Sequence, residues 1–399
     1  MPRHLPGELR FGASTTTPYR PVGFHGKVSR HCPVDPKPDI VFNAIPAPIE
    51  HTNLPLGATI YAMIVYRMNR PAYSPPQFLL VGRPSGRQGS RGHPRFRAKS
   101  EPSGIGRMQM AVNSTVALVT GASRGAGRGI ARALGAHGCT VYVTGRTLNP
   151  GDAEVPGTIH ATALEVTEAG GNGIAVQCDH GDDQQVKALI DRIIEEQGRL
   201  DILINNACYQ SHAISAPGQF WEKPLEIAEM MNVGLRSGFV ASWYAAPHMV
   251  KQDKGLVLFT SSPGANHYCF GPCYGAQKAG VDKMAHDMGI DFADSGSHVA
   301  AASIWMGPLT TERLLEMMEA APDKFGHLEG KLESTEYTGH VAWAMFNDPR
   351  MMERWNGKVV IGAEVGREYE IKDRGGNYPL SVRRTTDTPT PEFAAYKVK

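Results

Sequence analysis

A phenol and an ammonium group stand four residues apart in the segment Tyr274-Gly-Ala-Gln-Lys278. On a helix, this spacing places both side chains on the same face. A phenol titrates near ~10, and a neighbouring ammonium ion favours the phenolate, which would bring Tyr274 into a working range for proton transfer. Such a pair could protonate the alkoxide that forms when a hydride reaches a carbonyl carbon. The spacing alone arises by chance about once in a chain of this length, so the hypothesis needs support from other residues.

Two hydroxyl groups, Ser261 and Ser262, precede Tyr274 by about a dozen residues and follow an apolar run that predicts a strand. A serine at a strand end can donate a hydrogen bond to a substrate oxygen as negative charge develops on it. Taken alone, either serine is better explained as a structural hydroxyl. The ordered set of motifs around them favours a substrate-binding and catalytic role, and the residues leave the choice between the two serines open.

A glycine-rich turn, Thr120-Gly-Ala-Ser-Arg-Gly-Ala-Gly127, directly follows the apolar run Val116–Val119. Glycines let a strand turn sharply into a helix whose free N–H groups face a pyrophosphate at close range. The strand before the turn and the helix after it make this pattern typical of a dinucleotide site. The residues expected to hold the dinucleotide here are Gly121, Ser123, Arg124, Gly125, Ala126 and Gly127.

The second predicted strand ends at Arg146 instead of an acidic residue that would bind a ribose 2′-hydroxyl. Arg146 and Arg124 could instead pair with a 2′-phosphate, so we expect NADP(H). The alternative is two solvated arginines and a preference for NAD. Asp179, after the third strand, is expected at the adenine edge. Asn205 and Asn206, after the fourth, are expected at the middle of the cofactor, although either could be a structural cap.

Short apolar runs alternate with helical patterns such as Arg128–Gly138 and Gln184–Gln197. This alternation predicts an α/β fold, a single doubly wound, Rossmann-type parallel sheet of about seven strands with helices on both faces. Ligands of such sheets bind at the carboxyl ends of the strands, where every motif above lies. The predicted strands are Val116–Val119, Thr140–Val143, Ile174–Gln177, Ile202–Ile204, Leu256–Phe259, Val299–Ile304 and Lys358–Ile361.

The 399-residue chain has a net charge of +2 that is unevenly distributed. Residues 1–110 hold 15 Lys and Arg against 5 Asp and Glu, and 16 of the 29 prolines. We expect a disordered extension there, a catalytic domain over 111–372 and a C-terminal tail over 373–399. A targeting peptide or a basic arm for nucleic acid are the alternatives for 1–110. The interleaving of aromatic and basic side chains that is typical of nucleic-acid grooves is lacking, so no nucleic-acid partner is expected.

The longest apolar run of the first part, Leu56–Val65, is far shorter than the ~20 residues of a membrane span, so no transmembrane segment is expected. The 6 cysteines lack a paired metal-ligand spacing, so no metal is expected. Several of them lie in apolar runs as small hydrophobic residues. This pattern favours a reducing compartment, the cytoplasm, and leaves peripheral membrane or organellar association open.

From about Thr115 to about Ile371 the chain resembles the short-chain dehydrogenase/reductase family, in its glycine turn, its Asn-Asn-Ala segment, its serine and its Tyr-x-x-x-Lys. The resemblance implies that Asn232 joins Tyr274 and Lys278 in a proton relay. It selects Ser261, thirteen positions before the tyrosine, as the catalytic serine, and Thr311 as a cofactor contact. Tyr274 and Lys278 would also hold the cofactor, and a homodimer or homotetramer is implied.

Within the family, four stretches look most like a subgroup associated with NADP-dependent carbonyl reduction of steroids and xenobiotic ketones. These are residues 261–264, 332–337, 355–358 and 368–371. The implied reaction is reduction of a bulky apolar ketone or aldehyde, or oxidation of the matching alcohol. The alternatives are an NAD-dependent enzyme of the same fold and a non-catalytic NADP-binding sensor, which would predict loss of the tyrosine, lysine or serine.

Three positions depart from the family pattern without removing a reacting group: Ala126, Cys208 and Met306 stand where isoleucine, glycine and proline are usual. Residues 310 to about 339 are expected to form a mobile cap over the substrate, or else an ordinary amphipathic surface helix. An insert after Cys208 adds side chains that indicate a mainly apolar substrate pocket. They are Tyr209, His212, Phe220 and Trp221.

Overall fold

The computed structural model describes residues 114–394 and contains one seven-stranded sheet. The strand order is β3-β2-β1-β4-β5-β6-β7, and every neighbouring pair is parallel. All seven predicted strands form, so the doubly wound fold is confirmed. The strands are β1 (Val116–Val119), β2 (Thr140–Gly145), β3 (Asn172–Gln177), β4 (Ile202–Asn205), β5 (Gly255–Ser261), β6 (Val299–Trp305) and β7 (Lys358–Ile361).

Continuous apolar sequence explains the central strands, because every residue of β1, β2, β4, β5 and β6 is buried. The chain runs outward from β1 through β2 to β3 and then returns to β4, on the other side of β1. The connections leave β1 and β4 in opposite directions, so a crevice opens at their carboxyl ends. This crevice is where the fold places a ligand.

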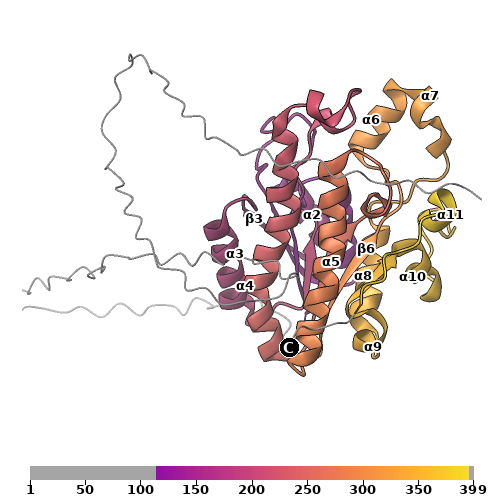
Figure 1. Cartoon of the computed structure of the whole chain (residues 1–399). Helices are drawn as coiled ribbons and strands as arrows, with labels where there is room; N and C mark the ends of the chain where they lie inside the picture. The colour runs from indigo at the N-terminus through magenta and orange to yellow at the C-terminus, as the bar shows by residue number, and fades with distance from the viewer. Residues whose placement is uncertain (1–113, 395–399) are drawn as a thin grey trace, which may run out of the picture. The chain divides into compact units, whose positions relative to one another are not determined.

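Three helices cover each face of the sheet. The helices α1 (Gly125–Ala136), α2 (Ile159–Glu168) and α8 (Tyr337–Asn347) enclose one half of the core, which contains Ile130, Ile159 and Val341. The other half is enclosed by α3 (Asp183–Gln197), α4 (Ser237–Gln252) and α5 (Pro272–Asp294), which lie side by side in Figure 1. The spacing of apolar residues that predicted α3 puts Val186, Leu189 and Ile193 against the sheet.

The helices α1 and α8 pack closely although two hundred residues separate them. A Cβ added to Gly339 would lie 2.6 Å from the Cβ of Ala133, so the helix backbones approach more closely than larger residues allow. Glu336 begins α8 and accepts hydrogen bonds from Arg132, at 2.7 Å, and from Arg374 of the tail. The helix that leads from the glycine turn is therefore held by the C-terminal part of the domain.

Smaller elements lie around the carboxyl edge of the sheet and at the end of the chain. Between β4 and α4 come three 3₁₀ turns and one π-helical turn: His212–Ile214, Phe220–Glu222, Leu225–Ala228 and Met231–Arg236. After β6 come α6 (Glu312–Ala320), α7 (Pro322–Phe325) and the 3₁₀ turn Gly326–Leu328, and after β5 the 3₁₀ turn Pro263–Ala265. The remaining helices are α9 (Met351–Trp355), α10 (Gly362–Glu368) and α11 (Val382–Thr386).

Residues 373–394 of the predicted tail fold back on the domain. Val382 is buried beside Trp305 and Ala265. The amide of Asn266 donates to the Pro389 carbonyl at 2.8 Å, and the hydroxyl of Thr388 lies 3.2 Å from Nδ1 of His267. The tail therefore supports the loop that follows β5.

The expected N-terminal extension, the run Leu56–Val65 and Cys32 lie outside the described residues. Within residues 114–394, none of the helices combines the length and apolar character that crossing a bilayer requires. Five cysteines of this part of the chain are free thiols, and Cys139 and Cys178 are buried, as the apolar runs around them predicted.

Candidate active site

A cavity of about 490 Å³ opens at the carboxyl edge of the sheet, between the glycine turn and the strand ends of β2, β3 and β4. Gly121 has a φ of 64°, and a Cβ on it would lie 2.7 Å from the Cα of Ala207. A Cβ on Gly127 would lie 2.6 Å from Nδ2 of Asn206. Only glycine fits these two positions, which agrees with a turn that brings its backbone close to a phosphate. The predicted residues Gly121, Ser123, Arg124, Gly125, Ala126, Gly127, Arg146, Asp179, Asn206 and Thr311 all line the cavity.

The two asparagines that follow β4 have different roles. Asn206 donates from Nδ2 to the carbonyl oxygens of Thr120 (2.9 Å) and Gly121 (3.1 Å), and so fixes the glycine turn at the cavity wall. Asn205 is buried and donates to Oγ of Ser242 on α4 at 2.9 Å. The side chain of Asn205 thus points away from the cavity, which agrees with the structural alternative and corrects the expected cofactor contact.

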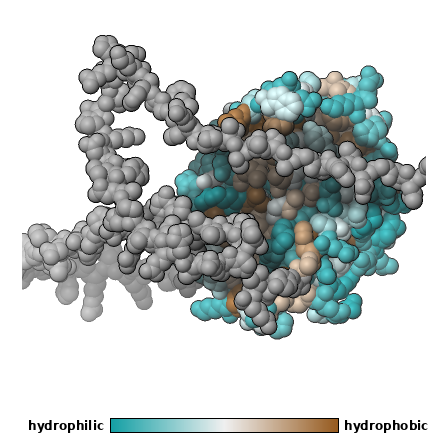
Figure 2. Space-filling model, viewed as in Figure 1, coloured by the Kyte–Doolittle hydropathy of each residue, from teal (hydrophilic) through white to brown (hydrophobic). Residues whose placement is uncertain are grey.

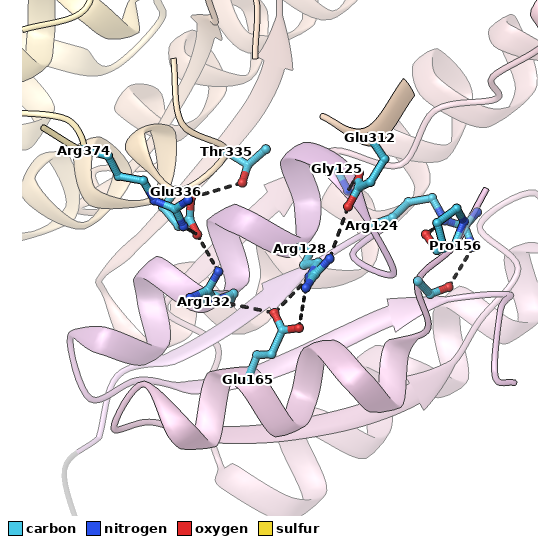
Figure 3. Close-up of polar contacts among 11 residues, drawn as sticks. Arg124, Gly125, Arg128, Arg132, Pro156, Glu165, Glu312, Thr335, Glu336 and Arg374 are labelled. Carbon is cyan, nitrogen blue, oxygen red and sulfur yellow. Dashed lines mark hydrogen bonds and ion pairs between the residues drawn. The ribbon is translucent and has the colours of Figure 1, made fainter. Parts of the chain in front are cut away.

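Two arginines lie together where β2 ends. Arg124 donates to the Thr147 hydroxyl (3.0 Å) and to the carbonyl oxygens of Gly157 (2.8 Å) and Pro156 (3.2 Å), as Figure 3 shows for Pro156. Arg146 is 68% exposed, and its guanidinium lies 3.9 Å from the Asp179 carboxylate. Burial and the nearby Arg146 lower the pKa of Arg124, whereas Glu312 acts in the opposite direction. The pair forms a cationic surface suited to an additional phosphate.

Tyr274 and Lys278 lie on the first two turns of α5, facing the end of β5. The phenol oxygen of Tyr274 is 2.8 Å from Oγ of Ser262. Lys278 donates from Nζ to the Thr260 carbonyl at 3.1 Å, and Nζ lies 5.6 Å from the centre of the Tyr274 ring. A Cβ on Gly264 would lie 2.5 Å from Cε1 of Tyr274, so the loop after β5 packs directly on the phenol. Hydroxyl, phenol and ammonium thus form one cluster.

The serine that contacts the phenol is Ser262, whereas the family resemblance selected Ser261 and the residues alone left both possible. Ser261 is the last residue of β5 and is fully buried. Its hydroxyl donates to the Lys278 carbonyl at 3.4 Å. Successive side chains of an extended segment point to opposite sides, and Ser262 is still extended, with φ −160° and ψ 167°. In this chain, the serine thirteen positions before Tyr274, Ser261, is therefore not the one that contacts the phenol.

Burial controls the acid–base state of the cluster. It raises the pKa of Tyr274 well above its ordinary value of 10, and the Ser262 hydroxyl offsets only part of this rise. Burial also lowers the pKa of Lys278. The expectation that Lys278 brings the phenol into the neutral range is thus not met in this structure, because burial of the phenol dominates its pKa. The phenol remains protonated at neutral pH and can serve as a proton donor.

Asn232 lies apart from the cluster. It is exposed in the π-helical turn, and Nδ2 donates to Glu229 at 2.9 Å. The same turn contains Gly234, whose φ of 140° bends the chain. A Cβ there would lie 3.2 Å from Nε2 of Gln277 and 3.3 Å from Sγ of Cys208. The bend, which the sequence pattern did not predict, brings Gly234 instead of Asn232 toward α5, so the Asn232 side chain does not contact Tyr274 or Lys278.

Several side chains near the site were not predicted as functional. Cys208 lines the cavity, and burial raises the pKa of its thiol while Lys278 lowers it. His180 also lines the cavity; its Nε2 lies 2.9 Å from the Thr144 hydroxyl, and burial lowers its pKa to about 4. Glu312 reaches the glycine turn from α6. One indication of Cys208 was available in the sequence, because this residue departs from the family pattern at its position. His180 and Glu312 directly follow the predicted site residues Asp179 and Thr311, but no sequence pattern singled them out.

The fold, the glycine turn and the serine–tyrosine–lysine cluster together define a class of nicotinamide-dependent oxidoreductases. The sequence model described as "short chain dehydrogenase" matches residues 115–321, and the chain belongs to the short-chain dehydrogenase/reductase family. The chain is 38% identical over 272 residues to dehydrogenase/reductase SDR family member 1 of Mus musculus, covering 65% of this chain and 83% of that protein. The human protein of that name is 36% identical, over 67% of this chain and 86% of its own length. This is the subgroup that the four stretches indicated, so that prediction is confirmed.

A more distant relative is hydroxysteroid dehydrogenase-like protein 2 of Danio rerio, at 30% identity over 64% of this chain and 59% of that protein. Among solved structures, a putative dehydrogenase from Xanthomonas campestris superimposes with a TM-score of 0.56 at 24% identity. The match covers 67% of this chain and 94% of that one. This likeness shows the fold. Family membership implies a nicotinamide cofactor, either NAD or NADP.

Proposed function

We propose that the protein reduces a ketone or aldehyde with NADPH, or oxidises the matching alcohol, and that Tyr274 is the proton donor. The contact of 2.8 Å between Tyr274 and Ser262 is the observation that carries this proposal. It allows one carbonyl oxygen to receive hydrogen bonds from both hydroxyls. A bound nicotinamide would supply a hydride to the carbonyl carbon, and the Tyr274 phenol would give its proton to the carbonyl oxygen. Lys278 places a positive charge beside the phenol and stabilises the phenolate that remains.

The proposed preference for NADP(H) rests on Arg124 and Arg146. Their guanidinium groups flank the end of β2, where a 2′-phosphate would extend from the adenosine ribose. Equilibrium titration with NADPH and NADH tests it. We expect NADPH to bind at least about tenfold more tightly, since charge-assisted hydrogen bonds contribute about 1.5–3 kcal/mol each. Tighter binding of NADH would favour the NAD-dependent alternative.

The proposed substrate is bulky and apolar. The insert between β4 and α4 exposes two large apolar side chains, Phe220 (60%) and Trp221 (69%), and residues of the same insert, Cys208, Gln210 and His212, line the cavity. One relative is named for hydroxysteroids and another as a dehydrogenase/reductase, which directs the choice of compounds. A panel of steroid, quinone and aliphatic carbonyl compounds, followed by NADPH oxidation, identifies the class.

The variant Tyr274→Phe tests the chemistry itself. We expect unchanged NADPH affinity and a loss of reductase activity of about 10²–10⁴-fold, which is the usual contribution of a positioned acid. Tyr268→Phe is the matched control, because Tyr268 is 80% exposed on the loop that leads into α5. Full activity in Tyr274→Phe would place the proton donor elsewhere. Cofactor binding without turnover of any compound, in the wild-type protein, would favour the non-catalytic sensor.

We further propose the cytoplasm as the compartment of the protein, in keeping with the free thiols of the described residues.

A further inference from the structure

A carboxylate of the protein itself lies where the glycine turn presents its N–H groups. Glu312 is the first residue of α6, and its Oε2 accepts a hydrogen bond from the Gly125 N–H at 3.2 Å. Its Oε1 accepts one from Nη1 of Arg128, also at 3.2 Å (Figure 3). Both donors belong to the first turn of α1, whose unpaired N–H groups and dipole attract anions. Glu312 also lines the cavity of the candidate site.

We propose that Glu312 acts as an internal anion that holds α6 against the pyrophosphate site, and that a dinucleotide must displace this carboxylate to bind. This inference rests on the proposed function only in that the cavity receives a dinucleotide. It predicts that the protein's own carboxylate lowers its affinity for the cofactor. It also predicts that cofactor binding releases the first turn of α6 from the glycine turn.

Few other contacts hold α6 in place. None of the residues of this helix is buried. Within the described part of the chain, the other polar contact of its side chains is between Arg313 and Gln210, at 3.2 Å. Thr311 caps the helix, its hydroxyl accepting from the Leu314 N–H at 3.3 Å. The Glu312 carboxylate is therefore a main connection between α6 and α1, the helix that begins in the glycine turn.

The surroundings allow Glu312 to leave without exposing an unpaired charge. Arg128 also donates to Glu165 on α2, from Nε at 2.9 Å and from Nη2 at 2.6 Å, and this pair does not depend on Glu312. The Glu312 side chain is 29% exposed, so water can solvate its carboxylate after release. The Gly125 N–H would then be free to bind a phosphate oxygen. A phosphate of the dinucleotide can thus replace the Glu312 carboxylate reversibly at this contact.

Two ligands separate competition at the pyrophosphate site from a general effect of charge. NADPH contains a pyrophosphate, whereas adenosine 2′-monophosphate carries only the 2′-phosphate. We expect Glu312→Gln to tighten NADPH about three- to tenfold, because a neutral amide accepts weaker hydrogen bonds than a carboxylate, and to change the affinity for adenosine 2′-monophosphate less than about twofold. Glu316→Gln is the matched control, because it removes the same charge one turn further along α6, at an exposed position. It should leave both affinities unchanged.

Thermal unfolding gives a second readout. Without ligand, Glu312→Gln should unfold at a lower temperature than the wild-type protein, and saturating NADPH should abolish the difference. Unchanged or weaker NADPH binding by Glu312→Gln would overturn the proposal, and so would equal tightening of both ligands or an equal effect of Glu316→Gln. Wild-type protein that binds neither NADPH nor NADH overturns the proposed function as well. If the wild-type protein binds NADPH and Glu312→Gln binds it with the same affinity, only the role of Glu312 is overturned.

Discussion

At the scale of single residues, the direction in which each side chain points decides the chemistry. Ser261 and Ser262 are adjacent and identical in type, yet one contacts the backbone of α5 and the other contacts the phenol. Tyr274 is kept protonated by burial, and the hydroxyl of Ser262 is its hydrogen-bond partner. Which of two adjacent serines faces the phenol at the end of β5 therefore decides which hydroxyl belongs to the cluster.

Replacing each serine by alanine distinguishes their roles. We expect Ser262→Ala to lower kcat about 10²–10³-fold, as the loss of one donor to a developing oxyanion does. Ser261→Ala removes a long hydrogen bond of 3.4 Å to the Lys278 carbonyl and a contact with the buried Asp282 carboxylate, but none with the phenol, so its kcat should stay within about threefold of the wild-type value. Steady-state kinetics with a carbonyl compound that the wild-type protein reduces measures both. The reverse order of losses would restore Ser261 as the catalytic serine.

Residue types and spacing predicted which side chains lie at the site but not how they are oriented. The glycine turn, Arg124, Arg146 and the pair Tyr274–Lys278 all lie where the order of strands and motifs placed them. The side chains of Asn205, Asn232 and Ser261 are oriented differently from what their predicted roles led us to expect. Their orientations follow from a hydrogen bond to α4, a bend in a π-helical turn and the alternation of an extended strand. These are tertiary and backbone features that a single sequence does not specify.

At the scale of elements, the loop after β6 is fixed by a buried acid. Glu333 donates its N–H to the Pro308 carbonyl at 2.8 Å and accepts from the Thr310 N–H at 2.9 Å. Its carboxylate has no side-chain hydrogen-bond partner within the described residues and is 1% exposed. Burial and Asp373 raise its pKa to about 7, while the Gly307 N–H acts in the opposite direction.

This raised pKa sets a direction for the dependence of stability on pH. An acid with a folded pKa of about 7 and an ordinary value of 4.5 holds its proton longer in the folded state. The contribution of Glu333 to the free energy of unfolding therefore falls as the pH rises from 4.5 to about 7, by on the order of 3 kcal/mol. We expect Glu333→Gln to reduce the difference in Tm between pH 5 and pH 8, measured by circular dichroism. An unchanged difference would show that Glu333 titrates normally.

The support of the β5 loop by the tail gives another prediction at this scale. Asn266 lies four residues after Ser262, and its amide binds the Pro389 carbonyl. Asn266→Ala should raise KM for the carbonyl substrate about threefold, the effect of one neutral hydrogen bond, and leave the Kd of NADPH unchanged. Initial rates and a cofactor titration measure the two effects. A matching change in the Kd of NADPH would mean that the tail supports the whole site instead of the substrate loop.

At the scale of the whole molecule, the described part of the chain presents an exposed apolar surface on α4. Phe239 (48% exposed) and Trp243 (61%) are four residues apart on one side of this helix. Figure 2 shows hydrophobic side chains among hydrophilic ones on the face that α4 and α5 form. Exposed aromatic side chains grouped on a helix are typical of a protein interface.

We therefore expect the protein to form a homodimer or homotetramer through this surface, as the family resemblance implied. Trp243→Glu would place a charge in the centre of the interface and should shift the protein toward the monomer. Light scattering coupled to size-exclusion chromatography measures the mass of both proteins. Leu164→Glu, at a similarly exposed apolar position (60%) on α2, is the control. A monomeric wild-type protein, or identical masses for the wild-type protein and Trp243→Glu, would contradict this expectation.

The close packing of α8 on α1 has a consequence for how the protein is made. The ribosome synthesises α1 early and α8 about two hundred residues later, and contacts between such distant segments form slowly. Until α8 emerges, the helix that begins at the glycine turn leaves part of its apolar side in water. A polypeptide that is truncated before α8 should therefore aggregate instead of folding into a smaller nucleotide-binding protein, although it would contain every glycine of the turn.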